Sequence, residues 1–279
     1  MEGRQCNNTA CEKESCANCN QAAGSAGMLE PANEKSNIKK VIAVMSGKGG
    51  VGKSLVTASL AGMLAEEGYK VGIMDSDVTG PSIPKMFGMS GTVSGDEKGI
   101  YPEISKNGIK IISVNLLLED KTEPVIWRGP VIAGVVKQFW SDVYWGELDY
   151  LLIDMPPGTG DVPLTVFQSI PVDGAVVITS PQDLVKLIVQ KAYNMAHKMD
   201  IPVIGMIENY SYLECPDCKK RIEVFGKSNI DAAALELGIP VLGKLPIIPE
   251  FAALADEGRF DEVRNEYVAD AVKTIIQMK

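Results

Sequence analysis

Histidine is nearly absent from this chain of 279 residues, in which His197 is the only one. A metal site built on several histidines is therefore excluded. Long apolar runs are also missing, since no stretch reaches the roughly 18 residues that a membrane-spanning helix needs. We expect His197 to lie on the surface of a helix predicted over 183–199.

Positive charge is scarce as well. The chain has 27 Lys and Arg against 36 Asp and Glu, which gives a net charge of −9. Non-specific binding of nucleic acid depends on clustered Lys and Arg, so this balance argues against a nucleic-acid partner. The N-terminus lacks the basic segment and apolar core of a secretory signal peptide. We therefore expect a cytoplasmic protein that binds neither nucleic acid nor membrane.

The composition changes near residue 37. Residues 1–37 are polar, rich in Asn, Ala, Ser and Gly, and contain four of the six cysteines. Such a segment buries too little apolar surface to fold alone, so we predict that it is flexible. Residues 38–279 are numerous enough to form one large domain with a full core.

Short apolar runs alternate with helical patterns throughout residues 38–279. Strands that are apolar on both faces and separated by helices are typical of a mainly parallel sheet. The predicted fold class is therefore α/β, with three layers: a central sheet and helices on both of its faces. The predicted strands are 41–45, 71–75, 109–115, 150–155, 174–179, 203–208 and 241–245. The clearest helical patterns are 183–199 and 261–278, and 88–108 is predicted to be a loop or small hairpin.

A phosphate-binding loop is predicted at 47–54, where the sequence reads G-x-x-x-x-G-K-S. The loop lies between the apolar run 41–45 and a helical pattern over 55–67, which is the context that the motif requires. A helix N-terminus offers N–H groups and a positive dipole end to a polyphosphate. We expect Lys53 to reach the β- and γ-phosphates and the Ser54 hydroxyl to bind Mg²⁺. Further contacts with the nucleotide are expected from Gly47, Lys48, Gly49, Gly50, Val51 and Gly52.

The same loop also satisfies G-x-G-x-x-G, the pattern of dinucleotide-binding folds. Such a fold has no use for the pair Lys53 and Ser54, and the acidic residue expected about 20 positions later has only Asp75 and Asp77 as loose candidates. A glycine-rich turn without a ligand is the other alternative, but four glycines are costly in an ordinary turn. The P-loop is the favoured interpretation.

Acidic residues stand where two apolar strands end, which is where parallel α/β sheets bind their ligands. We expect Asp154 to hold Mg²⁺ through a water beside the P-loop hydroxyl. Asp75 or Asp77 is expected to orient the attacking water or the metal shell. Gly158, in the loop after Asp154, is expected to sense the γ-phosphate with its N–H. The alternative is that these aspartates only cap the turns or helices that follow them.

Cys215 and Cys218 form a C-x-x-C motif shortly after the predicted strand 203–208. In a reducing cytosol, such a pair favours metal or redox chemistry over a structural disulfide. From the residues alone a thioredoxin-like dithiol, a zinc site and an iron–sulfur cluster all remain open. Either metal site needs further ligands, which a two-fold dimer would supply.

Four more cysteines, spaced C-x4-C-x4-C-x2-C, lie in the polar N-terminal segment: Cys6, Cys11, Cys16 and Cys19. Four thiolates suit a second iron–sulfur cluster. A zinc site, or a thiol-rich segment that passes metal on without holding it tightly, is the alternative.

Taken in order, these motifs resemble the Mrp/Nbp family of iron–sulfur carrier ATPases. That family belongs to a group with a deviant Walker motif, together with MinD, ParA and the nitrogenase iron protein. The resemblance covers residues 39 to 259. It rests on GKGGVGKS (47–54), DSDVTGPS (75–82), WRGP (127–130), DMPPGTGD (154–161), SPQD (180–183), IENYS (207–211), ECPDC (214–218) and LPIIPE (245–250).

The resemblance implies a P-loop NTPase fold, slow ATP hydrolysis, and ATP and Mg²⁺ as ligands. It implies that Lys48 reaches across a homodimer to the partner's nucleotide, where its charge would stabilise the transition state. It also implies that Asn209 reads the adenine edge. This chain reads Asn209-Tyr210-Ser211, where the family more usually has Asn-Met-Ser.

By the same resemblance, Cys215 and Cys218 hold a labile [4Fe–4S] cluster at the dimer interface, and the cluster is transferred to apo-proteins. Eukaryotic-type members carry an N-terminal four-cysteine cluster, although with wider spacing than this chain has. One alternative is an ATP-driven electron donor like the nitrogenase iron protein, whose cluster cysteines are far apart in sequence. The other is a ParA/MinD-type positioning ATPase, which needs a basic surface or a basic C-terminal helix, whereas 261–278 is acidic.

Overall fold

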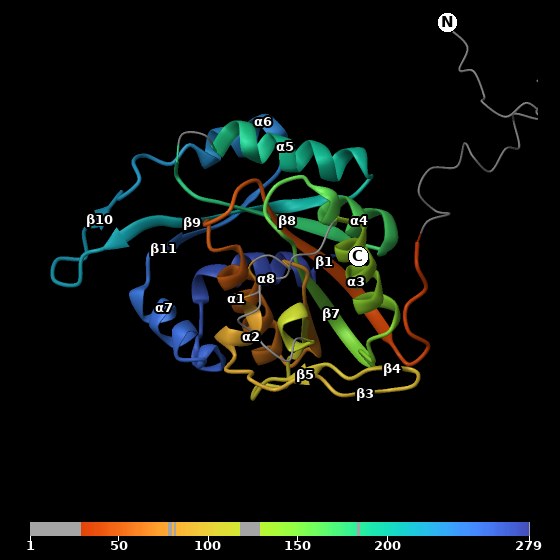
Figure 1. Cartoon of the computed structure of the whole chain (residues 1–279). Helices are drawn as coiled ribbons and strands as arrows, with labels where there is room; N and C mark the ends of the chain where they lie inside the picture. The colour runs from red at the N-terminus through yellow and green to blue at the C-terminus, as the bar shows by residue number, and fades with distance from the viewer. Residues whose placement is uncertain (1–28, 78–79, 81, 118–128, 183–184, 279) are drawn as a thin grey trace, which may run out of the picture.

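The computed structural model describes residues 29–77, 80, 82–117, 129–182 and 185–278. At its centre lies a sheet of nine strands in the order β10-β9-β8-β1-β7-β2-β6-β5, with β11 pairing with β9 (Figure 1). Its strands are β1 (Asn37–Ser46), β2 (Val71–Asp75), β5 (Glu103–Ile104), β6 (Lys110–Ser113), β7 (Glu147–Asp154), β8 (Gly174–Thr179), β9 (Val203–Glu214), β10 (Arg221–Ile222) and β11 (Val241–Pro246). Only β5 and β10 run antiparallel to their neighbours. The predicted mainly parallel sheet is confirmed.

Helices cover both faces of this sheet (Figure 1). On one face lie α3 (Gly129–Ser141), α4 (Asp161–Ser169), α5 (Val185–Lys198) and α6 (Ile230–Leu237). On the other lie α1 (Lys53–Glu66), α2 (Ile83–Met86), α7 (Pro249–Asp256) and α8 (Ala269–Ile276). None of the helices in the described ranges has the length and apolar character needed to cross a membrane.

Strand β1 shows why the predicted strands are apolar on both faces. Successive side chains of a strand point to opposite sides of the sheet. Ile42 and Val44 pack into the core on the α1 side, whereas Val41, Ala43 and Met45 pack into the core on the α3 side. All five are buried. The strand before the P-loop is therefore held from both sides.

The closing segment differs from the single helix predicted over 261–278. Its first half forms two short 3₁₀ turns, Phe260–Glu262 and Glu266–Val268, and α8 begins only at Ala269. The side chain of Asn265 accepts a hydrogen bond from the Tyr267 N–H at 3.2 Å, and this local bond competes with helix formation. The prediction of a continuous helix is therefore wrong in its first half.

The segment 88–108 contains a small hairpin, as predicted, formed by β3 (Gly95–Asp96) and β4 (Gly99–Ile100). The Asp96 carboxylate accepts hydrogen bonds from the Lys98 N–H (2.9 Å) and from the hydroxyls of Tyr144 (2.8 Å) and Tyr101 (2.9 Å). These donors lower the pKa of Asp96 to about 2. The carboxylate thus ties the hairpin to the segment before β7.

The residues just before β1 already pack on the domain. The Glu30 N–H donates to the Ser169 carbonyl at 2.8 Å, and the Trp140 indole donates to the Glu30 carbonyl at 2.9 Å. The Glu30 carboxylate also pairs with Lys137 at 2.9 Å.

The single histidine, His197, lies exposed in the last turn of α5, as predicted.

Candidate nucleotide site and cysteine hairpin

The predicted P-loop joins the carboxyl end of β1 to the N-terminus of α1. Gly50 and Gly52 have φ angles of +79° and +74°, a backbone region that favours glycine. Gly52 is the N-cap of α1, and the helix begins at Lys53. The strand–loop–helix arrangement expected for a phosphate-binding loop is therefore present.

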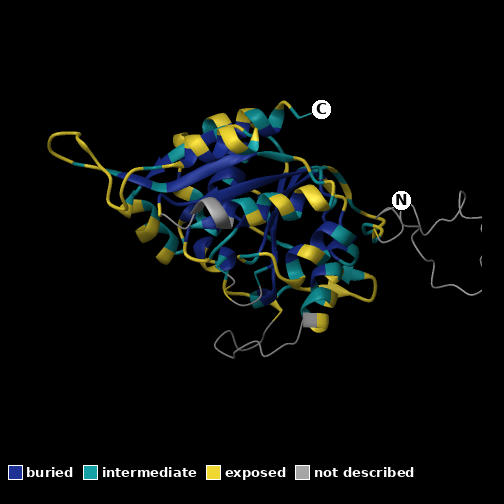
Figure 2. Cartoon of the chain, turned by 90° about the horizontal axis from the view of Figure 1, so that it is seen from above, coloured by how far each residue is buried: buried dark blue, intermediate teal, exposed yellow. Residues whose placement is uncertain are grey.

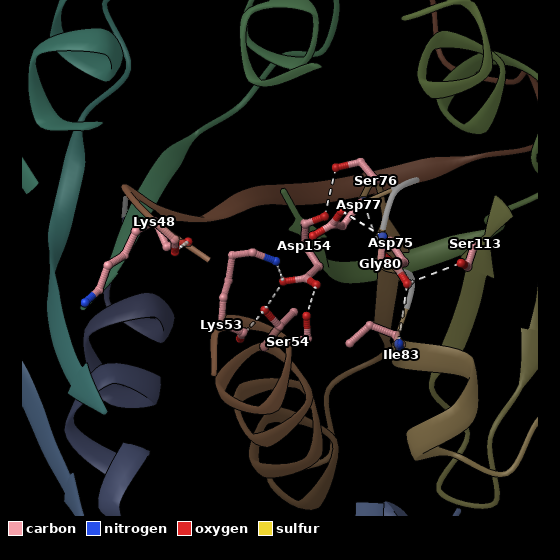
Figure 3. A network of polar contacts seen from close by, with 12 residues as sticks. Lys48, Lys53, Ser54, Asp75, Ser76, Asp77, Gly80, Ile83, Ser113 and Asp154 are labelled. Carbon is pink, nitrogen blue, oxygen red and sulfur yellow. Dashed lines mark hydrogen bonds and ion pairs between the residues drawn. The ribbon is translucent and has the colours of Figure 1, made fainter. Parts of the chain in front are cut away.

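Asp154, at the end of β7, collects three donors from the first turns of α1 (Figure 3). Lys53 Nζ lies 2.7 Å from Asp154 Oδ1, and the Ser54 hydroxyl donates to Oδ2 at 2.6 Å. The Thr57 hydroxyl donates to Oδ1 at 2.8 Å. Sequence reasoning missed Thr57, although a residue four positions after Lys53 lies on the same helix face. Asp154 is fully buried, so the Lys53 ammonium balances its charge while the two hydroxyls satisfy its oxygens.

Asp75 lies next to Asp154 across the β2–β7 pair and is buried. It accepts hydrogen bonds from the Asp77 N–H and the Ser113 hydroxyl, each at 3.2 Å. Burial, followed by the nearby charge of Asp154, raises the pKa of Asp75 well above its ordinary value. Asp77, rather than Asp75, lines the open pocket.

That pocket has a volume of about 360 Å³ and opens over the P-loop. This volume is within the range of small-molecule sites. Residues 48–54 form one side, and Asp77, Ser82 and Pro157 add to it. Residues of α7 that the sequence did not point to complete the lining: Ala252, Ala255 and Asp256. Lys53, Ser54 and Asp77 all face this pocket, where a polyphosphate is expected to bind.

Three predicted site residues make other contacts within the chain. Lys48 points away from Asp154 (Figure 3), and its ammonium donates to the side-chain oxygen of Gln182. The Gly158 N–H donates to the Ser46 carbonyl at 2.8 Å. Asn209 is buried, and its Nδ2 donates to the Val51 carbonyl at 3.0 Å. The roles expected for these residues toward a nucleotide remain predictions.

The C-x-x-C motif lies at the turn of a hairpin formed by β9 and β10. Strand β9 is longer than predicted and ends at Glu214, so Cys215 follows it directly. The Cys215 N–H donates to the Lys220 carbonyl, and the Lys219 N–H donates to the Cys215 carbonyl, both at 3.0 Å. Lys219 has a φ of +60°. The turn is closed by its own backbone.

Both cysteines are free, with Cys215 half-buried and Cys218 exposed. Hydrogen bonding from the backbone N–H groups of Cys218 and Asp217 lowers the pKa of the Cys215 thiol. A thiolate is the form that binds metal. The two thiols are therefore accessible and suited to metal ligation.

The hairpin projects beyond the body of the domain (Figures 1 and 2). Every residue from 216 to 227 is exposed. The exposed residues of the hairpin include three large apolar side chains: Ile222 is 45% exposed, Val224 49% and Phe225 42%.

The second predicted cluster site, formed by the N-terminal cysteines, lies outside the described residues: Cys6, Cys11, Cys16 and Cys19. Within the described ranges, no group of three or more His, Cys, Asp or Glu side chains is arranged to hold a metal ion.

Comparisons with known proteins agree with this architecture. The family described as ParA: NUBPL iron-transfer P-loop NTPase matches residues 37–278. An iron–sulfur cluster carrier protein of Clostridium perfringens is 46% identical in an alignment of 272 residues that covers 92% of this chain and 94% of that protein. A protein of the same name from Methanocaldococcus jannaschii is 50% identical over 225 residues, covering 80% of this chain and 78% of that one.

Solved structures show the same fold. A nucleotide-binding protein from Archaeoglobus fulgidus in complex with ADP has a TM-score of 0.74 and 44% identity, covering 82% of this chain and 90% of that one. The MinC:MinD complex of Aquifex aeolicus has a TM-score of 0.60 at 18% identity, covering 86% and 96%. At that identity the likeness concerns the fold alone. The match over 37–278 places the chain in the family of NUBPL iron-transfer P-loop NTPases.

Proposed function

We propose that this protein is an ATP-dependent iron–sulfur cluster carrier, which assembles a labile [4Fe–4S] cluster as cargo and delivers it to apo-proteins. One observation carries the proposal. The accessible pair Cys215 and Cys218 follows directly on β9, the strand whose Asn209 contacts the P-loop. The names of the relatives, iron–sulfur cluster carrier proteins, support the same function.

A homodimer is part of this proposal. A [4Fe–4S] cluster takes four cysteine thiolates, and one hairpin provides two. A second copy related by two-fold symmetry would provide the other two. The exposed apolar side chains of Ile222, Val224 and Phe225, on the same projecting hairpin as the thiols, favour such a contact. A cluster shared between two chains is easy to release, which suits a carrier.

The nucleotide chemistry follows from the P-loop. Hydroxyl and carboxylate oxygens are the ligands that Mg²⁺ prefers, and Ser54 Oγ and Asp154 Oδ2 lie 2.6 Å apart. Bound there, Mg²⁺ would neutralise the charge that develops on the phosphates. The Lys53 ammonium would leave the Asp154 carboxylate and bind the phosphates instead. Asp77 would orient the attacking water. Lys48 would leave Gln182 to reach the nucleotide of the second copy.

Anaerobic reconstitution with iron and sulfide tests the carrier function. The intact chain would be compared with a variant in which all four N-terminal cysteines are serine, and with Cys215→Ser/Cys218→Ser. We expect the N-terminal variant, but not the double variant, to bind iron and sulfide at about four of each per dimer. The bound cluster should then activate an apo-protein that requires one.

Stoichiometric zinc without a visible chromophore would contradict the proposal, and so would full transfer by the double variant. If the cluster bound only through the N-terminal cysteines, the cargo site would lie in the N-terminal segment and not on the hairpin. Sedimentation of the reconstituted sample tests the dimer separately from cluster binding.

A further inference from the structure

Tyr210 has an unusual backbone conformation for its place in a strand. It lies inside β9, yet its φ is +59°, in the left-handed region that bulky residues rarely adopt. The β9–β11 register is irregular at the same level, between the pairs Glu208–Lys244 and Tyr212–Pro246. A strained backbone of this kind persists only where its surroundings hold it. The contacts of Tyr210 therefore show which parts of the molecule hold this conformation in place.

The side chain of Tyr210 lies against the P-loop. A Cβ placed on Gly52 would lie 2.6 Å from the Tyr210 hydroxyl and 2.2 Å from Asn209 Nδ2. Asn209 Nδ2 also donates to the Val51 carbonyl at 3.0 Å. The end of the P-loop therefore rests on two consecutive side chains of β9.

The residue before this pair holds the base of the cysteine hairpin. The Glu208 carboxylate is 1% exposed and accepts hydrogen bonds from the Ser211 and Ser228 hydroxyls at 2.6 and 2.7 Å. Ser211 lies on the strand that enters the hairpin, and Ser228 follows its return strand. One buried carboxylate thus fixes both ends of the hairpin beside Tyr210.

We propose that Tyr210 is a positioning residue that couples nucleotide occupancy of the P-loop to the presentation of Cys215 and Cys218. A nucleotide that shifts Val51 and Gly52 displaces the surface against which the Tyr210 hydroxyl lies. The left-handed backbone of Tyr210 then relaxes toward the extended form, which rotates the strand leading to Cys215. The inference rests on the proposed carrier function, because it assigns that function's ATP dependence to one side chain. Coupling of this kind requires that the nucleotide bind the two arrangements with different affinity.

Alkylation of the apo-protein tests the coupling without any cluster. The intact chain would be treated with iodoacetamide anaerobically, with and without Mg²⁺ and a non-hydrolysable ATP analogue. Mass spectrometry of the digest would give a separate rate for each cysteine. We expect the analogue to change the rate at Cys215 by about fivefold or more. Rates at two protein concentrations separate this effect from coverage by a second copy, since only the latter depends on concentration.

Tyr210→Phe and Tyr210→Met remove the hydroxyl that lies against Gly52. We expect both variants to bind the analogue but to lose most of the change at Cys215. Tyr212→Phe is the matched control, because it removes a hydroxyl two residues along the same strand and should keep the full change. A full change in either Tyr210 variant would overturn the proposal, as would an unchanged Cys215 rate in intact protein that binds the analogue. Cluster binding, measured separately, still decides the carrier function in that case.

Discussion

At the scale of single residues, the P-loop contains two glycines that differ in what surrounds them. Both have positive φ, but nothing lies within 4 Å of a Cβ on Gly50, whereas a Cβ on Gly52 meets Asn209 and Tyr210. We expect Gly50→Ala to cost about 1 kcal/mol from backbone strain alone. Gly52→Ala adds overpacking and should cost about 3 kcal/mol in total. Urea denaturation of the two variants measures the difference, and equal losses would contradict this account.

Thr57 allows a second test at this scale, because its hydroxyl is buried and donates to the Asp154 carboxylate. Thr57→Val keeps the shape of the side chain and removes that donor. Since the acceptor is charged, we expect a loss of about 2 kcal/mol in the free energy of unfolding. Thr165→Val is the control, because the Thr165 hydroxyl donates to an uncharged acceptor, the Asp161 carbonyl one turn earlier in α4. A similar loss in both variants would show that the bond to Asp154 has no special weight.

The sequence predicted the P-loop residues because their spacing is imposed by the ligand chemistry. It did not predict Thr57, Glu208 or the α7 side of the pocket. Their positions depend on how distant elements pack, and Ala252 or Ala255 carries no chemical signal of its own. It also left Asp75 and Asp77 equivalent, whereas packing buries the former and leaves the latter at the pocket.

At the scale of elements, the β3–β4 hairpin is tied to the domain through Asp96 and two tyrosine hydroxyls. Because the folded-state pKa of Asp96, about 2, is below the ordinary value of 3.8, its ionised form stabilises the fold. That contribution is complete above the unfolded pKa and is lost as the pH falls through about 2. Tyr144→Phe should therefore raise the pKa of Asp96 toward 3.8 and destabilise the protein at neutral pH.

Carboxyl NMR titration measures the pKa of Asp96 directly, and Tyr193→Phe on α5 is a control far along the chain from this hairpin. The difference in stability between intact protein and Tyr144→Phe should narrow as the pH approaches 2. A difference that is constant with pH would mean that the hydroxyl acts by packing alone.

Element boundaries were predicted well where burial on both faces imposes them and poorly where a local side-chain bond intervenes. Strands β2 and β8 have the predicted bounds, since both are wholly buried. Strand β9 extends beyond its apolar run because β10 pairs with its end. Neither this pairing nor the bond made by Asn265 in the closing segment leaves a periodic signal in the sequence.

At the scale of the whole molecule, residues 29–36 belong structurally to the domain, although their composition resembles that of the preceding segment. Because the polar composition of residues 1–28 predicts too little apolar surface to fold, we expect their deletion to leave the free energy of unfolding unchanged. Deleting residues 1–36 removes bonds to Ser169, Trp140 and the Trp145 N–H, and should cost about 3 kcal/mol at roughly 1 kcal/mol each. Thermal unfolding of the two truncated forms makes the comparison. Equal stability would place the domain boundary where the composition changes.

The projecting hairpin also divides the charge of the molecule unevenly. Residues 214–228 contain four Lys or Arg and three Asp or Glu, a net charge of +1, so the rest of the chain carries −10. Two such molecules, or one and an acidic acceptor, therefore repel each other through their net charge, and the hairpin does not add to that repulsion. Electrostatic orientation of this kind acts over about 8 Å at physiological ionic strength. The charge distribution therefore favours approach at the projecting hairpin, where the two thiols lie.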